Sequence, residues 1–444
     1  MVDSSLYIDK QEDFPSIASK EAARIPVTDC DRTYAGPSIY AFYNIVCSVC
    51  GVGMLALSQS LSKGGWAAIA LIIIAWWMVL YLSIIVNKCL YLPRNRKLHH
   101  TRLSSIPAIA DDAFGKFGGW IAYFFQTWIF LGASILHFVL AGANMNKLCE
   151  NTAGEIGVVP WTIIFCIVIC IPFIFLKSMS DTGWTSISGA LAILITTFIC
   201  VVVAGVDNNT GLPQRIASGQ IAPITHQSFV LSGFPGALAN IAVSFGANMM
   251  FPSIEAAMRK PKQWPQVVTY ALTTCACLYI LIAVPGYYVY GDSVKNPVYY
   301  SLPDGIPLKI CIVLVTLAVL APIPIFLSAF NLECEEAMNL TVERLGRKRE
   351  FIFRAIFRSL TIIFCAVVGC TIPFFDLLMG LVGSFGFCTC IFIVPIPCYW
   401  RLTGFRNKPI YELAWNILIL LFGFVGLIFG TWFAVEDLVH EFQK

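Results

Sequence analysis

The sequence predicts an all-α, polytopic membrane protein with eleven transmembrane helices, on three observations. Its 444 residues are 58% hydrophobic and their mean hydropathy is +0.76. Only 12% are charged, about half the roughly 25% found in soluble globular proteins. Eleven separate apolar runs are long enough for a helix to cross the hydrocarbon core of a bilayer. Soluble enzymes and nucleic-acid-binding proteins are excluded, because the chain has too few charges to cover a soluble exterior.

Each apolar run is expected to form one spanning helix of about 20 residues. The runs cover residues 38–62, 66–91, 117–147, 159–176, 184–206, 234–258, 265–290, 306–338, 352–372, 374–399 and 411–435. Residues 1–37 precede them as a polar tail that contains no pattern of a cleavable signal peptide. We therefore expect the first helix to insert into the membrane by itself.

Lysine and arginine are distributed unequally between the segments that join the runs. If residues 1–37 are cytosolic, 23 of the 29 basic residues lie in cytosolic segments and six lie on the other side. Basic residues accumulate in the cytosolic loops of membrane proteins. The bias predicts a cytosolic N-terminal tail and a luminal or extracellular C-terminus.

The first ten runs divide into two sets of five. Residues 38–206 form the first set, an outer loop follows at 207–233, and residues 234–400 form the second set. Residues 401–444 add the eleventh helix and a short luminal or extracellular tail. Because five is odd, the second set must be inverted relative to the first. Inverted repeats are typical of secondary transporters, whose substrate site lies between the repeats near the membrane midplane.

Small residues interrupt the first and the sixth runs near the expected bilayer centre. The substrate-binding candidates there are Cys50, Gly51, Val52, Gly53, Met54, Ser244, Phe245 and Gly246. Unwound backbone at this depth is tolerated only where it lines a cavity or is buried in protein. Its N–H groups could hold a carboxylate and its carbonyls an ammonium, so that backbone alone would recognise an amino acid. The alternative interpretation is close helix packing, which also favours small residues.

Four motifs along the chain match a known pattern. They are Gly51 to Leu57 with Gly-Gly-Trp at 64–66, Phe251 to Glu255, Pro285 to Tyr287, and Ile372 to Phe375. In order and content they resemble the amino acid/auxin permease family. The pattern is most similar to vesicular inhibitory amino acid transporters and to the vacuolar amino acid transporters of fungi and plants.

The resemblance implies the LeuT-like, five-plus-five inverted-repeat fold of the amino acid–polyamine–organocation superfamily, with one extra helix. It implies a monomeric transporter of amino acids, neutral ones being expected, that works by alternating access and uses a proton gradient. A vacuolar or vesicular membrane is favoured, and the plasma membrane remains open. An enzyme is not expected, because His, Asp and Glu do not cluster, and no cofactor or metal site is indicated.

Four polar residues inside the runs are further candidates. Gln126 is expected to bind substrate and Ser328 to take part in coupling, because both fall where the superfamily fold lines its cavity. His137 is either a proton relay or a hydrogen-bonded residue at a helix contact. Glu255 is either an inner gate or the partner of Arg259, four residues on.

The coupling ion is predicted from the inner half of the eighth run. Residues 326–330 supply only one hydroxyl, Ser328, which is too few oxygens for a sodium cage. A proton is therefore expected. The alternatives are a sodium-coupled amino acid symporter and an amino acid-sensing transceptor on the same fold. Near the tenth run, Asp376 is expected to cap the N-terminus of a helix.

The charge bias yields a prediction about topology. Reporter domains fused to the two ends of the chain should be found on opposite sides of the membrane, the N-terminal one in the cytosol. Protease protection of each reporter in sealed vesicles measures this. Both reporters on one side would contradict an odd number of spans.

Overall fold

Helices make up nearly all of the described chain. A computed structural model describes residues 35–92, 102–175, 183–219, 223–337, 346–405 and 408–443. Within these ranges the only β-type pairing is one isolated bridge between Gly36 and Met258. The predicted all-α class is therefore confirmed for the described residues. Most of the polar tail at 1–37 lies outside them.

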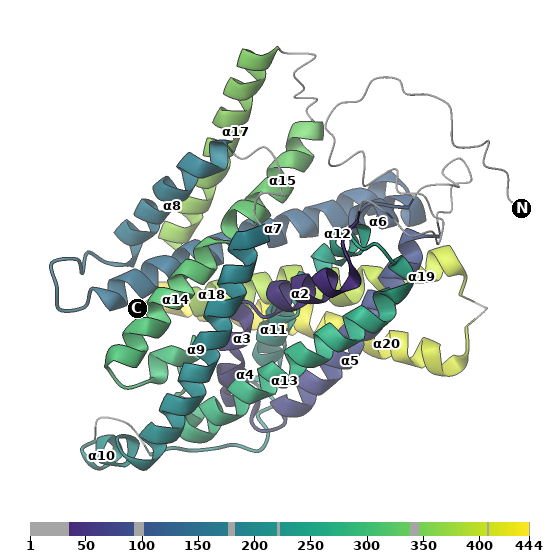
Figure 1. The fold of residues 1–444 in the computed structure, drawn as a ribbon. Coiled ribbons are helices and arrows are strands. Elements are labelled where there is room, and N and C mark those ends of the chain that lie inside the picture. The colour runs from purple at the N-terminus through teal and green to yellow at the C-terminus, as the bar shows by residue number, and fades with distance from the viewer. Residues whose placement is uncertain are drawn as a thin grey trace, which may run out of the picture.

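Each apolar run corresponds to helix in the structure (Figure 1). The first five runs hold α2 (Ser38–Val49), α3 (Val52–Leu55), α4 (Leu57–Gly64), α5 (Ala68–Leu90), α7 (Lys116–Leu148), α8 (Val158–Phe175) and α9 (Gly183–Asn209). The next five hold α11 (Phe234–Ser244), η4 (Gly246–Met250), α12 (Phe251–Ala256), α13 (Trp264–Tyr290), α14 (Ile306–Leu320), α15 (Ile323–Ala337), α17 (Arg347–Thr371), α18 (Phe375–Leu381), η8 (Val382–Phe387), η9 (Thr389–Ile393) and α19 (Pro395–Thr403). The last run holds α20 (Ile410–Val425), η10 (Gly426–Gly430) and α21 (Thr431–Phe442), and the short helices α6 (Ile106–Phe114) and α10 (Leu212–Ala217) lie in connections.

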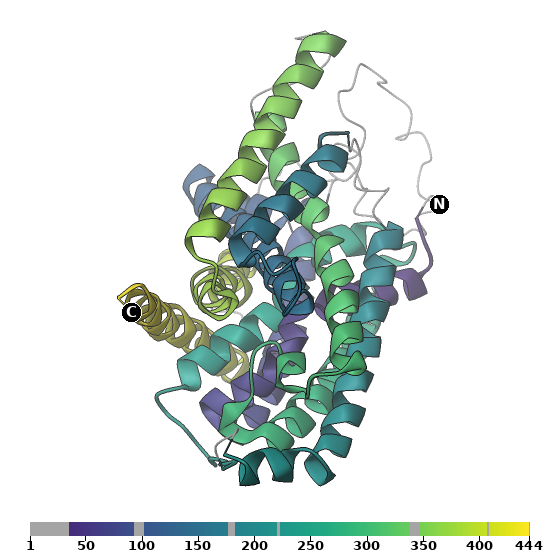
Figure 2. The same ribbon diagram turned by 90° about the vertical axis from the view of Figure 1, so that its left-hand side faces the viewer.

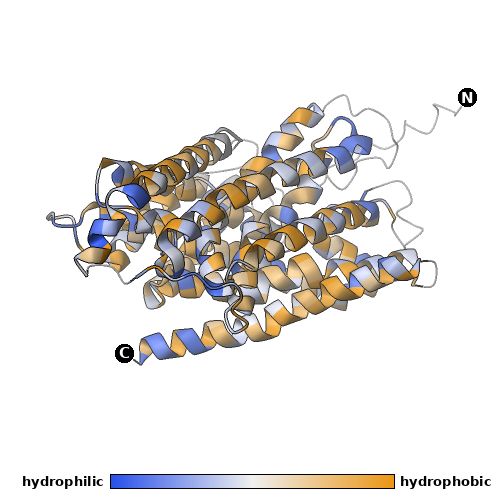
Figure 3. Ribbon diagram, turned by 90° about the horizontal axis from the view of Figure 1, so that it is seen from below, coloured by the Kyte–Doolittle hydropathy of each residue, from blue (hydrophilic) through white to orange (hydrophobic). Residues whose placement is uncertain are grey.

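The lengths and the surface of these helices are those of a multi-pass membrane protein. Nine helical stretches of the described chain are long and apolar enough to cross a bilayer, and Ser38–Val49 and Val158–Ile174 are shorter apolar helices. The count of eleven spans and the inverted repeat stay predictions. Figure 3 shows hydrophobic residues along the helices and hydrophilic ones gathered mainly toward the two ends of the bundle. Large apolar side chains such as Trp77 and Trp432 are exposed, as expected of a surface that faces lipid.

Several runs are not single straight helices. The first is interrupted at Gly51, whose backbone is extended, and the sixth changes to a 3₁₀ turn at Gly246. The eighth run was expected to be one helix, but it divides into α14 and α15 next to Pro322, which has no N–H to donate. The tenth run contains the π-helical turns η8 and η9, which sequence periodicity did not indicate.

The C-terminal helix lies at the edge of the bundle. Only 28% of the most apolar 18 residues in Ile410–Phe442 are buried, and Figure 2 shows the yellow C-terminal helix at the edge of the bundle. It packs mainly on α18 and η10. The extra helix thus contacts the tenth run and, mainly through η10, also α11 of the interrupted sixth run.

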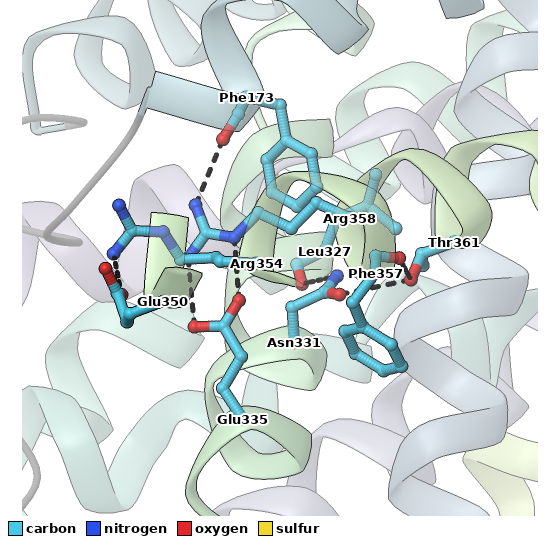
Figure 4. A network of polar contacts seen from close by, with 9 residues as sticks. All are labelled: Phe173, Leu327, Asn331, Glu335, Glu350, Arg354, Phe357, Arg358 and Thr361. Carbon is cyan, nitrogen blue, oxygen red and sulfur yellow. Dashed lines mark hydrogen bonds and ion pairs between the residues drawn. The ribbon is translucent and has the colours of Figure 1, made fainter. Parts of the chain in front are cut away.

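A buried ion pair joins α8, α15 and α17 (Figure 4). Arg358 on α17 is 1% exposed, and its Nε donates to Glu335 Oε1 of α15 at 2.8 Å. Its Nη1 donates to the Phe173 carbonyl of α8 at 3.1 Å, and its guanidinium lies over the Phe173 ring. One turn away, Thr361 donates to Asn331 at 3.1 Å. These three helices are therefore tied together by polar contacts that lipid cannot replace.

The ion pair yields a prediction about stability. Arg358→Leu leaves Glu335 without its counter-ion and should destabilise the protein by about 3–5 kcal/mol, whereas the double variant Glu335→Leu/Arg358→Leu should recover most of that loss. The melting temperature in detergent is the measurement. Arg349→Leu, an exposed change on the same helix, is the control. An unchanged melting temperature for Arg358→Leu would contradict a structural role.

Candidate functional site

The two interrupted helices contact each other at their breaks. A Cβ atom at Gly53 would lie 2.6 Å from Ser244 Cα, and one at Gly246 would lie 2.1 Å from the Phe387 ring. No ordinary Cβ contact is this short. Gly53 therefore requires glycine, because its neighbour is backbone, and a side chain at Gly246 would have to displace the Phe387 ring. Close packing therefore explains the absence of side chains at Gly53 and Gly246. Their location at facing breaks in two helices still needs a further explanation.

One tyrosine links the two breaks. Tyr279 on α13 is fully buried, and its hydroxyl lies 2.8 Å from the Val49 carbonyl and 2.5 Å from the Ser244 carbonyl. Its ring packs edge-on against Phe245, with ring centroids 5.0 Å apart. A hydroxyl has one hydrogen, so it donates to one of these carbonyls at a time. Sequence analysis missed Tyr279, because one tyrosine in an apolar run is no signal on its own.

A cavity of about 160 Å³ lies beside the breaks. A cavity of roughly 150 Å³ engineered into another protein holds a benzene molecule, so this one has room for a small organic ligand. Its walls come from α2, α7, α9, η4, α14, α15 and the tenth run. Of the predicted site residues, Cys50, Gly51, Gly53, Gly246 and His137 line it. Gly51 differs from the other glycines, since a Cβ there would have only the Ser48 carbonyl within 4 Å, at 3.9 Å.

The other predicted site residues are not on the cavity wall. Met54, Ser244, Phe245, Gln126, Ser328 and Glu255 are all buried elsewhere. The Val52 side chain lies outside what the structure describes. Ser244 and Phe245 both contact Tyr279: the Ser244 carbonyl accepts from its hydroxyl, and the Phe245 ring packs against its ring. The structure thus brings the backbone of the breaks to the cavity but leaves Gln126 and Ser328 away from it.

His137 has the contacts expected of a hydrogen-bonded residue at a helix contact, and its role as a proton relay stays a prediction. It lines the cavity, and its Nδ1 contacts the Ala133 carbonyl one turn back on its own helix. Its ring packs against Phe326 of α15, with centroids 5.7 Å apart. Its second nitrogen, Nε2, is the one that this backbone contact leaves available.

Glu255 has a partner that the sequence did not indicate. The expected pair with Arg259 is wrong, because Glu255 Oε2 accepts from Arg102 Nε at 2.6 Å and both side chains are fully buried. The Tyr91 hydroxyl at the end of α5 donates to the other oxygen, and Arg102 also donates to the Pro252 carbonyl. Arg102 lies in the loop before α6, too far along the chain for helix spacing to reveal the pair.

The chain near Glu255 is also tied to the start of the first helix. Gly36 N donates to the Ala257 carbonyl at 3.1 Å, and Arg259 N donates to the Gly36 carbonyl at 2.8 Å. The end of α12, the start of α2 and the end of α5 are therefore held together. These contacts close the bundle at the end where the sequence predicts the cytosol.

Asp376 does not cap a helix as expected. The N-cap of α18 is Phe374, whose backbone is extended, and Asp376 lies in the first turn of that helix. Its Oδ2 is 3.5 Å from Gln59 Nε2 on α4. The capping prediction is wrong because the chain turns helical two residues earlier than a cap at Asp376 would require.

Comparison with known proteins identifies the family. The pattern of the family described as "Transmembrane amino acid transporter protein" matches residues 37–436. The chain belongs to the transmembrane amino acid transporter family. The predicted resemblance is thereby confirmed, and a non-enzymatic function in amino acid transport follows from membership.

Relatives and solved structures extend the match over most of the chain. The amino acid transporter AVT1E of Arabidopsis thaliana is 25% identical over 400 residues, which cover 88% of this chain and 72% of that protein. The vesicular inhibitory amino acid transporter of Xenopus tropicalis is 22% identical, with 97% of this chain and 82% of that protein covered.

Two solved transporters share the fold. The structure of MhsT in complex with L-phenylalanine has a TM-score of 0.54 at 12% identity and covers 88% of this chain and 98% of that one. A Na⁺-coupled sialic acid symporter has a TM-score of 0.55 at 12% identity and covers 91% of each chain. At this identity the likeness shows a LeuT-like transporter fold and nothing about substrate.

The Tyr279 link yields a prediction. Tyr279→Phe keeps the ring against Phe245 but removes the hydroxyl, which leaves both buried carbonyls without this donor at a cost of about 1–3 kcal/mol. We expect amino acid uptake by reconstituted protein to fall about tenfold, since 1.4 kcal/mol is a tenfold change in population. Tyr270→Phe removes a hydroxyl from an exposed tyrosine of the same helix and should have no effect. Equal uptake by Tyr279→Phe and wild type would contradict this link.

Proposed function

We propose that the protein is a secondary active transporter that moves neutral amino acids by alternating access, driven by a proton gradient. The observation that carries the proposal is the cavity between two helices that are interrupted at facing positions. Broken helices that meet at a central site are the usual substrate site of transporters with this fold. The N-terminus is proposed to be cytosolic and the protein to act as a monomer.

The chemistry of the cavity wall supports a neutral substrate. The described wall residues include no Asp, Glu, Lys or Arg, and most are apolar, such as Ile129, Phe130 and Phe387. A charged substrate side chain would have no partner there, and burying it unpaired is costly. The carboxylate and ammonium of the amino acid would bind backbone groups at Gly51 and Gly246, leaving the apolar wall to the side chain.

The buried contacts around Glu255 support a gating role. Access from that end requires α2, α5 and α12 to separate, and the Arg102–Glu255 pair and the Gly36 hydrogen bonds hold them together. We propose that these contacts form the inner gate in its closed state. A gate of this kind is broken and remade in each transport cycle, as alternating access requires.

Proton coupling is proposed over sodium coupling. Ser328, the single hydroxyl expected to serve a sodium site, does not line the cavity. The named relatives include plant amino acid transporters and a vesicular transporter, so a vacuolar or vesicular membrane is proposed. Such compartments are acidic inside, which provides a proton gradient.

The deciding experiment is uptake of labelled amino acids into proteoliposomes. We expect neutral amino acids to accumulate under an imposed pH gradient without sodium, and little accumulation under a sodium gradient at equal pH. Accumulation only with sodium would contradict proton coupling, and no uptake of any amino acid would contradict the function.

A matched pair of variants tests the cavity. Gly51→Leu places a side chain in the open space at the cavity wall and should reduce uptake at least about tenfold without loss of folded protein. Gly205→Leu makes the same change at an exposed glycine of α9 with no atoms near its Cβ position, and should leave uptake unchanged. Full uptake by Gly51→Leu would place the substrate elsewhere.

A further inference from the structure

A polar cluster of two buried and two half-buried residues lies beside the cavity. It consists of Asp376 on α18, Asn296 in the loop before α14, Gln59 on α4 and Asn240 on α11. Asn296 is 8% exposed, and its Nδ2 is 3.7 Å from the sulfur of Met379, a cavity-lining residue. The cluster therefore borders the cavity on the side of the tenth run.

The hydrogen bonding of this cluster is incomplete. Asp376 Oδ1 and Asn296 Oδ1 are both buried and have no hydrogen-bond partner, while the Asn296 side chain lies within interaction range of the Asp376 carboxylate. Both oxygens can only accept when Asp376 is ionised, so neither has a hydrogen to donate to the other. Rotating the Asn296 amide would supply an N–H to the carboxylate but would turn the amide oxygen toward the Met379 sulfur, which cannot donate. Buried acceptors without a donor cost about 1–3 kcal/mol each.

One proton on Asp376 would complete the cluster. The protonated carboxyl has an O–H that can be donated to the Asn296 oxygen, and it removes a charge from a place where ionised carboxylates are costly. We infer that Asp376 is the group that binds and releases the coupling proton of transport. This inference rests on the proposed function, because it names the site at which proton-driven transport acts.

The groups that face Asp376 favour a carboxyl that both binds and releases a proton. Two titratable groups of the described residues interact with the Asp376 carboxyl. One is the charged Lys63, one turn beyond Gln59 on α4, and the other is Tyr300. Burial and the unpaired Oδ1 of Asp376 favour the protonated carboxyl, whereas Lys63 and the amides of Asn296 and Gln59 favour the ionised one. A metal ion fits less well, since hard cations take about six oxygens and this cluster offers two unpaired ones.

The cluster also connects the proton to the moving parts of the site. Asn240 Nδ2 donates to Gln59 Oε1 at 3.4 Å, and Gln59 Nε2 lies 3.5 Å from Asp376 Oδ2. This chain of contacts runs from α11 through α4 to α18. The helices that follow the first break and precede the sixth-run break are thus joined to the carboxyl whose charge changes.

The experiment separates coupling from substrate exchange. Wild type, Asp376→Asn and Asp304→Asn are reconstituted, and two rates are measured for the amino acid that wild type accumulates best: exchange of labelled for unlabelled substrate without a gradient, and accumulation under a pH gradient. The exchange rate of Asp376→Asn should stay within about twofold of wild type, whereas its accumulation should fall at least about tenfold. Asp304 is an exposed carboxylate in an outer loop, and its variant should keep both.

A pH-sensitive dye inside the vesicles measures the proton directly. Wild type should move protons together with the amino acid, and Asp376→Asn should exchange the amino acid without moving protons. Asp376→Glu keeps a titratable group and should retain accumulation with a shifted pH of half-maximal rate. It keeps the inference testable if the asparagine variant does not fold.

Three results would overturn the inference. Accumulation by Asp376→Asn at the wild-type level would show that another group carries the proton. Loss of exchange together with loss of substrate-induced thermal stabilisation would show that Asp376 binds the substrate ammonium instead. Wild-type exchange that never couples to a pH gradient would refute proton coupling but leave amino acid transport intact, whereas absence of any wild-type exchange would refute the proposed function itself.

Discussion

The structure depends on how it satisfies two backbone carbonyls in the middle of interrupted helices. A carbonyl that leaves helical geometry inside a membrane has no water to accept from, so its partner must come from the protein. Here the hydroxyl of Tyr279 lies within reach of both Val49 O and Ser244 O. The hydroxyl donates to one of these carbonyls at a time, and Val49 O also accepts from Gly51 N at 2.8 Å. Tyr279 on α13 thus links the two breaks.

A few buried polar links join otherwise apolar helices. Arg102 and Glu255 join the loop before α6 to α12, and Arg358 and Glu335 join α17 to α15. Between apolar surfaces in lipid there is little hydrophobic gain from association, so such links determine which helices stay together. In the proposed transport cycle the first pair would separate, and the second would stay in place. Two similar ion pairs would thus differ in role, since one would break during transport and the other would keep its helices together.

The helices and their two breaks could be predicted from the sequence, whereas the partners of individual side chains could not. Apolar length predicted every helical run, and small residues at Gly51 and Gly246 predicted both breaks, because these signals are local in the chain. The partner of Glu255 was predicted wrongly, since Arg102 is 153 residues away and only the folded chain brings it near. Tyr279 gave no signal, because a tyrosine reveals its role only through what its hydroxyl reaches. Polar residues such as Gln126 and Ser328 were expected on the cavity wall and lie elsewhere, since the rotation of a helix is not encoded in its apolar length.

The contact between Gly53 and Ser244 has a consequence for how relatives of this protein differ. Where a hydrogen atom fills the only available space, no side chain can be varied without separating the two helices. At the proposed substrate site, the breaks would therefore supply fixed backbone groups for the part that all amino acids share. Discrimination between one amino acid and another would then depend on the opposite cavity walls, at positions such as Ile129 and Ala133 of α7 and Phe326 of α15. Substrate preference can then diverge freely on those surfaces while the shared half of the site stays unchanged.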